Sequence, residues 1–80
     1  MPKLPSIEGN ELLKFLRKLN FEVTRRKGSH VRLKSTDGRV TTIPIHKGKI
    51  LPKGLLRKII REDLKMSLQE FVDLYNKFKN

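Results

Sequence analysis

The stretch RRKGSHVRLKS, residues 25–35, combines an imidazole with side chains that bind phosphate. It holds His30, one of only two histidines in the chain, among five lysine and arginine residues. An exposed imidazole is present in both protonation states near neutral pH, which suits general acid or base catalysis. Lysine and arginine side chains stabilise extra negative charge on a phosphate in a transition state. These residue types therefore indicate chemistry on a phosphodiester.

The reaction that fits these residues is cleavage of an RNA chain by its own 2′-hydroxyl, a route that needs no metal. His30 would take the proton from that hydroxyl or deliver one to the leaving 5′ oxygen. Gly28 would let the backbone approach a phosphate closely, and Ser29 could donate its hydroxyl or its N–H to an oxygen. The acidic residues lack the spacing of a metal site. We therefore expect no metal and no other cofactor.

A simpler interpretation of the same residues leaves out catalysis. A solitary strand histidine beside basic residues is more often a solvent-facing or phosphate-touching residue than a catalyst, and most Gly-Ser pairs only form turns. His46 is interpreted as a loop residue or phosphate contact, and a role as a second acid or base stays open. The alternatives to a nuclease are a non-catalytic RNA-binding module and a basic protein that docks on an acidic partner.

The net charge of +11 is concentrated in the middle of the chain. Residues 25–61 hold 12 of the 19 lysine and arginine residues and a single acid, Asp37, whereas the remaining 43 residues carry seven charges of each sign. A localised excess of this kind indicates a polyanion-binding surface, so single-stranded or structured RNA is the favoured partner. The side chains expected to contact it are Arg25, Arg26, Lys27, Arg32, Lys34, His46, Lys47, Lys49, Lys53 and Arg57.

Length and composition set further limits. A chain of 80 residues predicts one domain, residues 1–80, with a modest core, and the absence of cysteine leaves helix and sheet packing to hold it. No apolar run approaches the roughly 20 residues of a membrane span, and the N-terminal residues lack the apolar segment of a signal peptide. We expect a soluble, cytoplasmic protein that has no membrane partner.

Helical periodicity appears at both ends of the chain. Leucines at helical spacing predict a helix near residues 7–19, with Ser6 as its N-cap and Asn20 in the left-handed conformation that ends it. Ser67 begins an S-x-x-E capping box, which predicts a last helix over residues 68–78. A further helix before it is indicated by the apolar stripe of Leu55, Leu56, Ile59, Ile60 and Leu64.

Between these helices the apolar residues alternate with a period of two, which is typical of strands. Two strands form a hairpin whose link contains Gly28, and Asp37-Gly38 predicts a tight turn before a third strand at residues 40–45. Pro44 has no N–H for a ladder, so this strand should lie at a sheet edge. The predicted fold is α+β, with the order α-β-β-β-α, a three-stranded antiparallel sheet with helices on one face, and a short C-terminal helix.

The alternation also orients the candidate residues. If Val31 and Leu33 face the core, then His30, Arg32 and Lys34 share the other face of the second strand. A sheet covered by helices on one side leaves its other side open to solvent and to a ligand. The sequence therefore predicts that His30 points away from the core, toward a possible substrate.

These segments, in this order, resemble the HicA toxins, small mRNA interferases of type II toxin–antitoxin systems. The resemblance covers residues 6 to about 64 and is carried by the K-G-S-H run that ends in His30, the P-x-H-x-G-K segment from Pro44 to Lys49, and the K-G-L-L-R start of the second helix. It implies a fold like that of a double-stranded RNA-binding domain, His30 as the catalytic histidine, ribosome-independent cleavage of mRNA, and inhibition by a HicB-type antitoxin. The chain departs from the family in Asn20, where a glycine is usual, and in its longer C-terminal helix.

Overall fold

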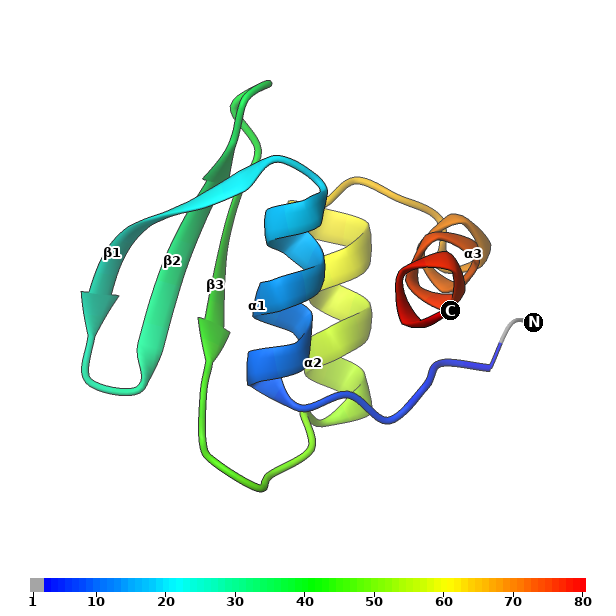
Figure 1. The fold of residues 1–80 in the computed structure, drawn as a ribbon, viewed down its shortest axis with the longest axis horizontal. Helices are drawn as coiled ribbons and strands as arrows, with labels where there is room; N and C mark the ends of the chain where they lie inside the picture. Colours follow the sequence, from blue (N-terminus) through cyan, green and yellow to red (C-terminus); the bar gives the residue numbers. More distant parts are fainter. Residues whose placement is uncertain (1–2) are drawn as a thin grey trace.

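The computed structural model describes residues 3–80, which form an antiparallel sheet covered on one side by helices. The elements, in order, are α1 (Gly9–Lys18), β1 (Phe21–Lys27), β2 (His30–Ser35), β3 (Val40–Pro44), α2 (Lys53–Lys58), a π-helical turn η1 (Ile59–Asp63) that continues α2, and α3 (Leu68–Lys79). Helices α1 and α2 lie beside the sheet, and α3 lies beyond them, away from the sheet (Figure 1). This arrangement confirms the predicted α+β fold and its α-β-β-β-α order with a C-terminal helix.

The three strands follow one another in the sheet, with β2 in the centre and β1 and β3 at the edges. Both connections are short and use glycine in the left-handed region, with φ of +56° at Gly28 and +93° at Gly38. Pro44 ends β3, and that strand lies at an edge of the sheet, as predicted. Proline has no N–H to donate, and at an edge no further strand needs that hydrogen bond.

The start of α1 differs from the prediction. The helix begins at Gly9, and its N-cap is Glu8, which makes no side-chain capping hydrogen bond, so the expectation that Ser6 caps the helix is wrong. The reason is that the preceding chain is extended: Ile7 is fully buried, and its carbonyl accepts a hydrogen bond from the N–H of Leu51 at 2.8 Å. Burial of Ile7 and this pairing with a distant segment replace a local cap.

Gly9 permits α1 to start against the end of β3. A Cβ built on Gly9 would lie 2.5 Å from the carbonyl oxygen of Pro44 and 3.2 Å from Cα of Ile45. At the other end of α1, Asn20 has φ of 70°, so it takes the left-handed conformation that the sequence predicted. At the start of the helix, any side chain larger than that of glycine would collide with Pro44. At its end, a β-branched residue would be strained in the left-handed conformation of Asn20.

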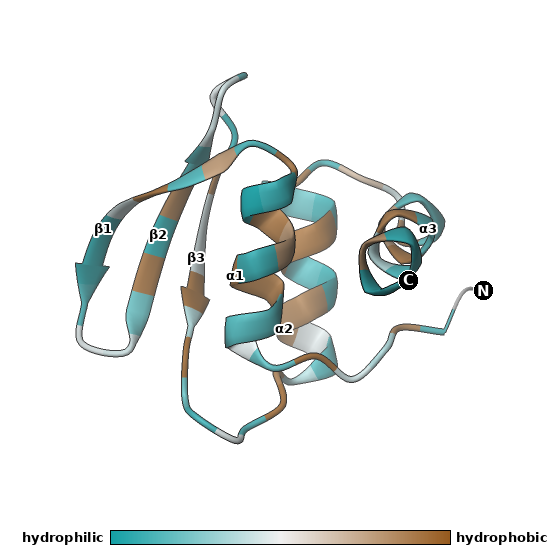
Figure 2. Cartoon of the chain, in the orientation of Figure 1, coloured by the Kyte–Doolittle hydropathy of each residue, from teal (hydrophilic) through white to brown (hydrophobic). Residues whose placement is uncertain are grey.

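A single hydrophobic core joins the sheet to the three helices. The sides of α1 and α2 that meet are apolar, while their outer surfaces are polar (Figure 2). The fully buried side chains of the core include Leu12, Leu16, Leu33, Ile43, Leu56, Ile59, Ile60 and Leu64. In the strands, β2 alternates strictly between exposed and buried residues, and Val23 of β1 is 37% exposed because β1 extends past the helices.

Helix α3 packs on α1 through aromatic rings. Ser67 accepts a hydrogen bond from the N–H of Glu70 at 3.0 Å, which confirms the predicted cap. The ring of Phe15 in α1 meets those of Phe71 and Tyr75 edge-on, at centroid distances of 5.4 and 5.3 Å. These rings are core, as the sequence suggested. Within residues 3–80, no helix has the length and hydrophobicity needed to cross a bilayer.

A polar contact between α1 and α3 adjoins this aromatic packing. The hydroxyl of Tyr75 donates to Glu11 Oε2 at 2.9 Å, and Lys79 Nζ donates to the same oxygen at 3.0 Å. Burial, and then the bond to Glu11, raise the pKa of Tyr75 to about 12. The bonds from Lys79 and Tyr75 lower the pKa of Glu11. The contact thus favours a neutral tyrosine and a charged glutamate.

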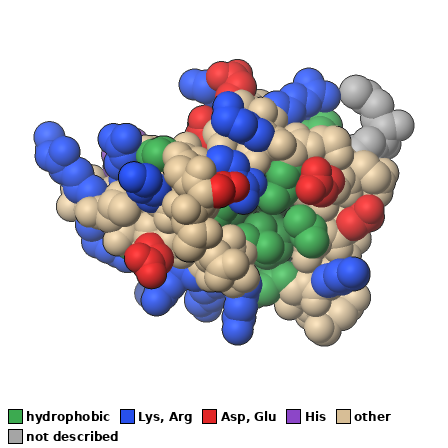
Figure 3. Space-filling view, turned by 90° about the horizontal axis from the view of Figure 1, so that it is seen from above, with side chains coloured by type: hydrophobic (Ala, Val, Ile, Leu, Met, Phe, Trp, Pro, Cys, Tyr) green, Lys and Arg blue, Asp and Glu red, His purple; other side chains and the backbone are tan. Residues whose placement is uncertain are grey.

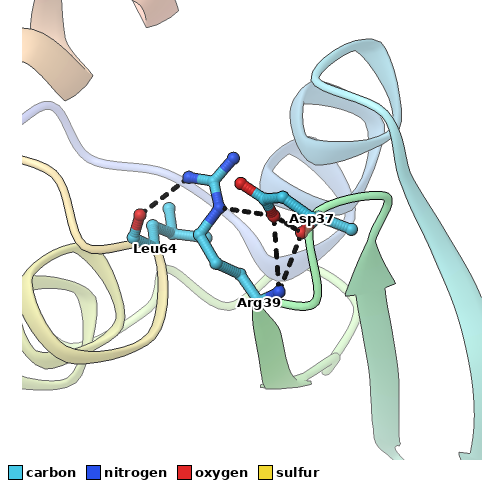
Figure 4. Close-up of polar contacts among 4 residues, drawn as sticks. Asp37, Arg39 and Leu64 are labelled. Carbon is cyan, nitrogen blue, oxygen red and sulfur yellow. Dashed lines mark hydrogen bonds and ion pairs between the residues drawn. The ribbon is translucent and has the colours of Figure 1, made fainter.

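A second polar contact joins the β2–β3 turn to the end of η1 (Figure 4). Arg39 donates from Nη1 to the carbonyl of Leu64 at 2.8 Å and from Nε to Asp37 Oδ1 at 3.0 Å, and its guanidinium lies 5.3 Å from the centre of the Phe21 ring. The hydroxyl of Ser35 also donates to Asp37. These bonds, that of Ser35 first and those of Arg39 next, lower the pKa of Asp37 to about 2.

Candidate active site

His30 is the first residue of β2 and lies on the face of the sheet that the helices leave open. Burial along β2 alternates, so that His30, Arg32 and Lys34 are exposed while Val31 and Leu33 are almost completely buried. This confirms the predicted orientation of the strand. Since imidazole chemistry on a polymer needs an accessible ring, the position of His30 meets the first requirement for catalysis.

A shallow hollow of about 210 Å³ surrounds His30 and is lined by residues from all three strands: Arg25, Lys27, His30, Arg32 and Thr42. The strand register explains this set. Lys27 pairs with His30, Arg25 pairs with Arg32, and Arg32 also pairs with Thr42. Paired residues in an antiparallel sheet project from the same face, so these side chains converge. Among residues 3–80, no acidic side chain lines the hollow.

A β-bulge in β1 puts two of these cations on the face of His30. The register shifts between Val23 and Arg25, so that Val23 pairs with Leu33 and Arg25 with Arg32. Without the extra residue, strict alternation from Val23 would turn Arg25 toward the side of the helices. The bulge is therefore what brings Arg25, and Lys27 two residues later, to the imidazole.

The bulge has the opposite effect on Arg26. This residue pairs with the buried Val31, so it lies on the side of the sheet that carries the helices, where β1 extends past them, and it is exposed there. Of the three consecutive cations that the sequence assigned to RNA, the structure thus brings Arg25 and Lys27 to His30 and separates Arg26 from it.

The β1–β2 turn fixes the end of the sheet at which His30 lies. Gly28 is exposed, with no atom within 4 Å of a built Cβ, so the structure uses it for its left-handed φ. The carbonyl of Ser29 accepts a hydrogen bond from the N–H of Ile45 at 2.6 Å. That bond holds the chain after β3 against the turn and brings His46 to the same end of the sheet as His30, although His46 does not line the hollow.

The loop after β3 is basic and exposed. Its residues His46, Lys47 and Lys49 are all exposed, and the N–H of Gly48 donates to Glu8 Oε1 at 3.0 Å, which fixes the loop beside the start of α1. Lys and Arg side chains project over much of the part of the surface formed by the sheet, at the left of Figure 3. The loop extends the positive surface beyond the hollow.

Helix α2 carries three exposed cations, Lys53, Arg57 and Lys58. The ammonium of Lys53 donates to the carbonyl of Leu4 at 2.5 Å, so it holds the N-terminal segment in place, and Arg57 is exposed on the helix surface. The cation of α2 that reaches the sheet is Lys58, which lines a groove together with Arg32. Sequence periodicity could not show that Lys58, and not a neighbouring cation of α2, faces the sheet. That follows only from the way α2 lies beside β3.

That groove has a volume of about 390 Å³ and runs between β3 and α2. It shares Arg32 and Thr42 with the hollow around His30, so the two depressions adjoin. Its other lining residues are Val40, Thr41, Leu55, Lys58, Ile59 and Asp63. Asp63 was not assigned to any site from the sequence. Its Oδ2 accepts a hydrogen bond from the hydroxyl of Thr41 at 2.8 Å.

The comparison with protein families matches residues 9–64, from the start of α1 to the residue after η1, to the family described as the HicA toxin of bacterial toxin–antitoxin systems. The chain belongs to the HicA toxin family. The matched region contains the His30 hollow and the adjoining groove, whereas α3 lies outside it. A search of curated proteins finds no matching sequence. Family membership gives this chain the role of a toxin in a toxin–antitoxin system.

Proposed function

We propose that this HicA-family chain is an endoribonuclease that cleaves mRNA without a metal, with His30 as the catalytic residue. One observation carries the proposal most directly: an exposed imidazole lies in a hollow with three cationic side chains, and no acid from the described part of the chain lines it. The family match adds to it, since the hollow lies within the matched region.

The proposed reaction is attack by a ribose 2′-oxygen on the adjacent phosphorus. The 2′-hydroxyl loses its proton as the new P–O bond forms, and the bond from phosphorus to the 5′ oxygen breaks as that oxygen gains a proton. The products are a 2′,3′-cyclic phosphate and a free 5′-hydroxyl. His30 takes the first proton or supplies the second, and either role contributes about 10²- to 10⁴-fold to the rate.

The cations of the hollow stabilise the charge that develops on the phosphate. Arg25 and Lys27 reach it from β1 and Arg32 from β2, so donors approach a bound phosphate from two sides of the imidazole. Fixed donors aimed at developing charge supply a large part of catalysis in phosphoryl chemistry. Lys34 on the same face, and His46, Lys47 and Lys49 in the loop, extend the contact to neighbouring phosphates of a single-stranded or structured RNA.

The decisive experiment compares RNA and DNA of one sequence in the presence of EDTA. The wild type should cut only the RNA and leave a cyclic phosphate, and His30→Ala should cut about 10²- to 10⁴-fold more slowly while its RNA affinity changes little. His46→Ala removes the other exposed imidazole at the same end of the sheet, which contacts a neighbouring phosphate in this proposal. It should weaken RNA binding, and at saturating RNA it should slow cleavage far less than His30→Ala does. If wild-type protein binds RNA tightly and leaves it intact, the chain is a non-catalytic RNA-binding module and the proposal fails.

We further infer that the partner of this toxin is an acidic antitoxin of the HicB type that covers the open face of the sheet. The support is charge: the middle of the chain carries the whole excess of +11, and three cations surround the candidate catalyst. Co-expression should yield a complex that does not cleave RNA. In this complex the backbone amide hydrogens of Arg25, Lys27 and Arg32 should exchange with solvent more slowly than in the free toxin. A complex that still cleaves RNA would contradict this assignment.

A further inference from the structure

The groove beside the His30 hollow is lined by one carboxylate and two cations. Asp63 lines it together with Lys58 and Arg32. A binding surface for phosphates alone would gain nothing from an acid, because like charges repel at this range. The only hydrogen bond to this carboxylate within residues 3–80 comes from Thr41. A carboxylate accepts about four hydrogen bonds, so Asp63 keeps acceptor capacity on the groove side.

The rest of the groove has the properties of a nucleobase site. Val40 and Leu55 supply apolar walls, and Arg32 supplies a guanidinium on which a base could stack. Thr42 and Lys58 add hydrogen-bond donors for ribose or phosphate oxygens. A volume of about 390 Å³ admits one purine nucleoside, and proteins read single-stranded RNA in this way, with a stacked base whose edge is hydrogen-bonded.

The groove lies close enough to His30 to hold a nucleotide next to the reacting phosphate. Arg32 and Thr42 line both depressions. Arg32 is two residues from His30 along β2, which corresponds to about 7 Å of strand. A base bound in the groove therefore belongs to a nucleotide adjacent to the phosphate in the hollow, on its 5′ or its 3′ side.

A carboxylate selects among the bases by their donors. Guanine alone presents two neighbouring donors, N1–H and the 2-amino group, which can both reach one carboxylate. Adenine and cytosine each place a ring acceptor beside the amino group, and uracil places a carbonyl on each side of its N–H. A good bidentate pair discriminates by about 1–3 kcal/mol, which is roughly 5- to 150-fold.

We propose that this groove is a guanine-binding subsite, in which Asp63 reads the base and thereby sets where the RNA is cut. This inference rests on the proposed nuclease function for its role in cleavage, whereas the recognition itself is a binding property. Two measurements separate the two ideas: affinity for short RNAs tests the subsite, and the position of cleavage tests its use.

The binding measurement uses His30→Ala, so that the RNA stays intact, and uridine-rich oligonucleotides with one guanosine, adenosine, cytidine or inosine. Guanosine should bind about tenfold more tightly than adenosine or cytidine, with inosine in between because it lacks the 2-amino group. Asp63→Asn on the same background should abolish the preference, since an amide offers one acceptor and one donor. Its oxygen can still accept from Thr41, so the fold should persist, and circular dichroism checks this. Equal affinity for all four oligonucleotides would overturn the proposal.

Two control variants separate direct reading by the carboxylate from indirect effects. Thr41→Val removes the hydrogen bond to Asp63 but leaves its carboxylate, so it should keep the guanine preference; loss of the preference in this variant would overturn direct reading. Lys58→Ala should weaken all the oligonucleotides by a similar factor. In wild-type protein, cuts should fall next to guanosine and spread to other positions in Asp63→Asn. Cleavage with no such pattern would overturn the use of the subsite in cleavage and leave the nuclease proposal standing. A binding preference for guanosine without any cleavage would support the subsite and overturn the nuclease proposal.

Discussion

The close approach of α1 to the end of β3 gives a prediction whose sign depends on the tertiary structure. Gly9 is buried, and a Cβ built on it would lie 2.5 Å from the carbonyl oxygen of Pro44, whereas ordinary contacts begin at 3.4 Å. Gly54, near the start of α2, is the matched control, since nothing lies within 4 Å of its built Cβ. The two substitutions to alanine change the same atoms in two very different surroundings.

The expected magnitudes follow from these distances. Replacing a helical glycine by alanine stabilises a protein by about 0.4–1 kcal/mol when the new methyl group meets no obstacle, because the unfolded chain loses conformational freedom. Gly54→Ala should show this gain. For Gly9→Ala the obstacle is backbone, which cannot rotate away, and overpacking costs about 1–3 kcal/mol. The net loss should be about 1–2 kcal/mol, a substantial part of the roughly 4–12 kcal/mol expected for 80 residues.

Urea unfolding followed by circular dichroism gives the free energy of unfolding of both variants, and a thermal scan gives their midpoints. Gly9→Ala should lower the midpoint of thermal unfolding by about 4–16 °C, and Gly54→Ala should raise it by a few degrees. Because Pro44 pairs with His30, Gly9→Ala should also slow RNA cleavage by the folded protein. If Gly9→Ala is as stable as the wild type, or gains as much as Gly54→Ala, then α1 does not pack on β3 as described here, and the reasoning is refuted.

Three further predictions concern charge. The neighbouring serine hydroxyl and arginine hold the pKa of Asp37 at about 2 instead of 3.8, so their stabilisation is complete above pH 3.8 and is lost as pH falls through 2. Asp37→Asn should therefore be less stable than the wild type at neutral pH in urea unfolding, and the two should converge near pH 2; a constant difference would contradict this. Tyr75 is the only tyrosine, so its near-ultraviolet titration should have a midpoint near 12, and the stability that depends on its neutral form should fall between pH 10 and 12. Glu11→Gln should lower that midpoint only partly, since burial is the larger cause; a midpoint of 10 in wild type would contradict the packing of α3. Arg25→Ala should reduce the slope of log affinity for RNA against log salt concentration by about one released counterion, and Arg26→Ala should reduce it less. Equal slopes in the two variants would contradict this prediction.

Local rules accounted for much of the fold in advance. The exposure of His30 followed from the alternation around Val31 and Leu33, and the left-handed conformation of Asn20 and the cap at Ser67 followed from residue types alone. Each of these depends on neighbours within about four positions along the chain. Such features can be predicted from the sequence because the backbone has only a few allowed conformations and the local side chains select among them.

The composition of the candidate site was predictable only in outline. The sequence identified His30 and a basic surface, but it assigned Arg25, Arg26 and Lys27 to RNA as one group. The bulge between Val23 and Arg25 divides that group between the two faces of the sheet. No residue type marks this bulge in the sequence, since it arises from the pairing of β1 with β2.

The sequence by itself determined the order of the elements, the charge of the middle segment and the direction in which His30 points. Only the tertiary structure decided that Ser6 lies outside the helix, that Lys53 binds a backbone carbonyl, and that Asp63 lies in a groove beside Arg32. The physical reason is the range of the interactions. Periodicity and capping act within a turn or along a strand. Register, helix packing and grooves arise from contacts between separate elements, such as the bond of Thr41 in β3 to Asp63 in η1, 22 residues further along the chain.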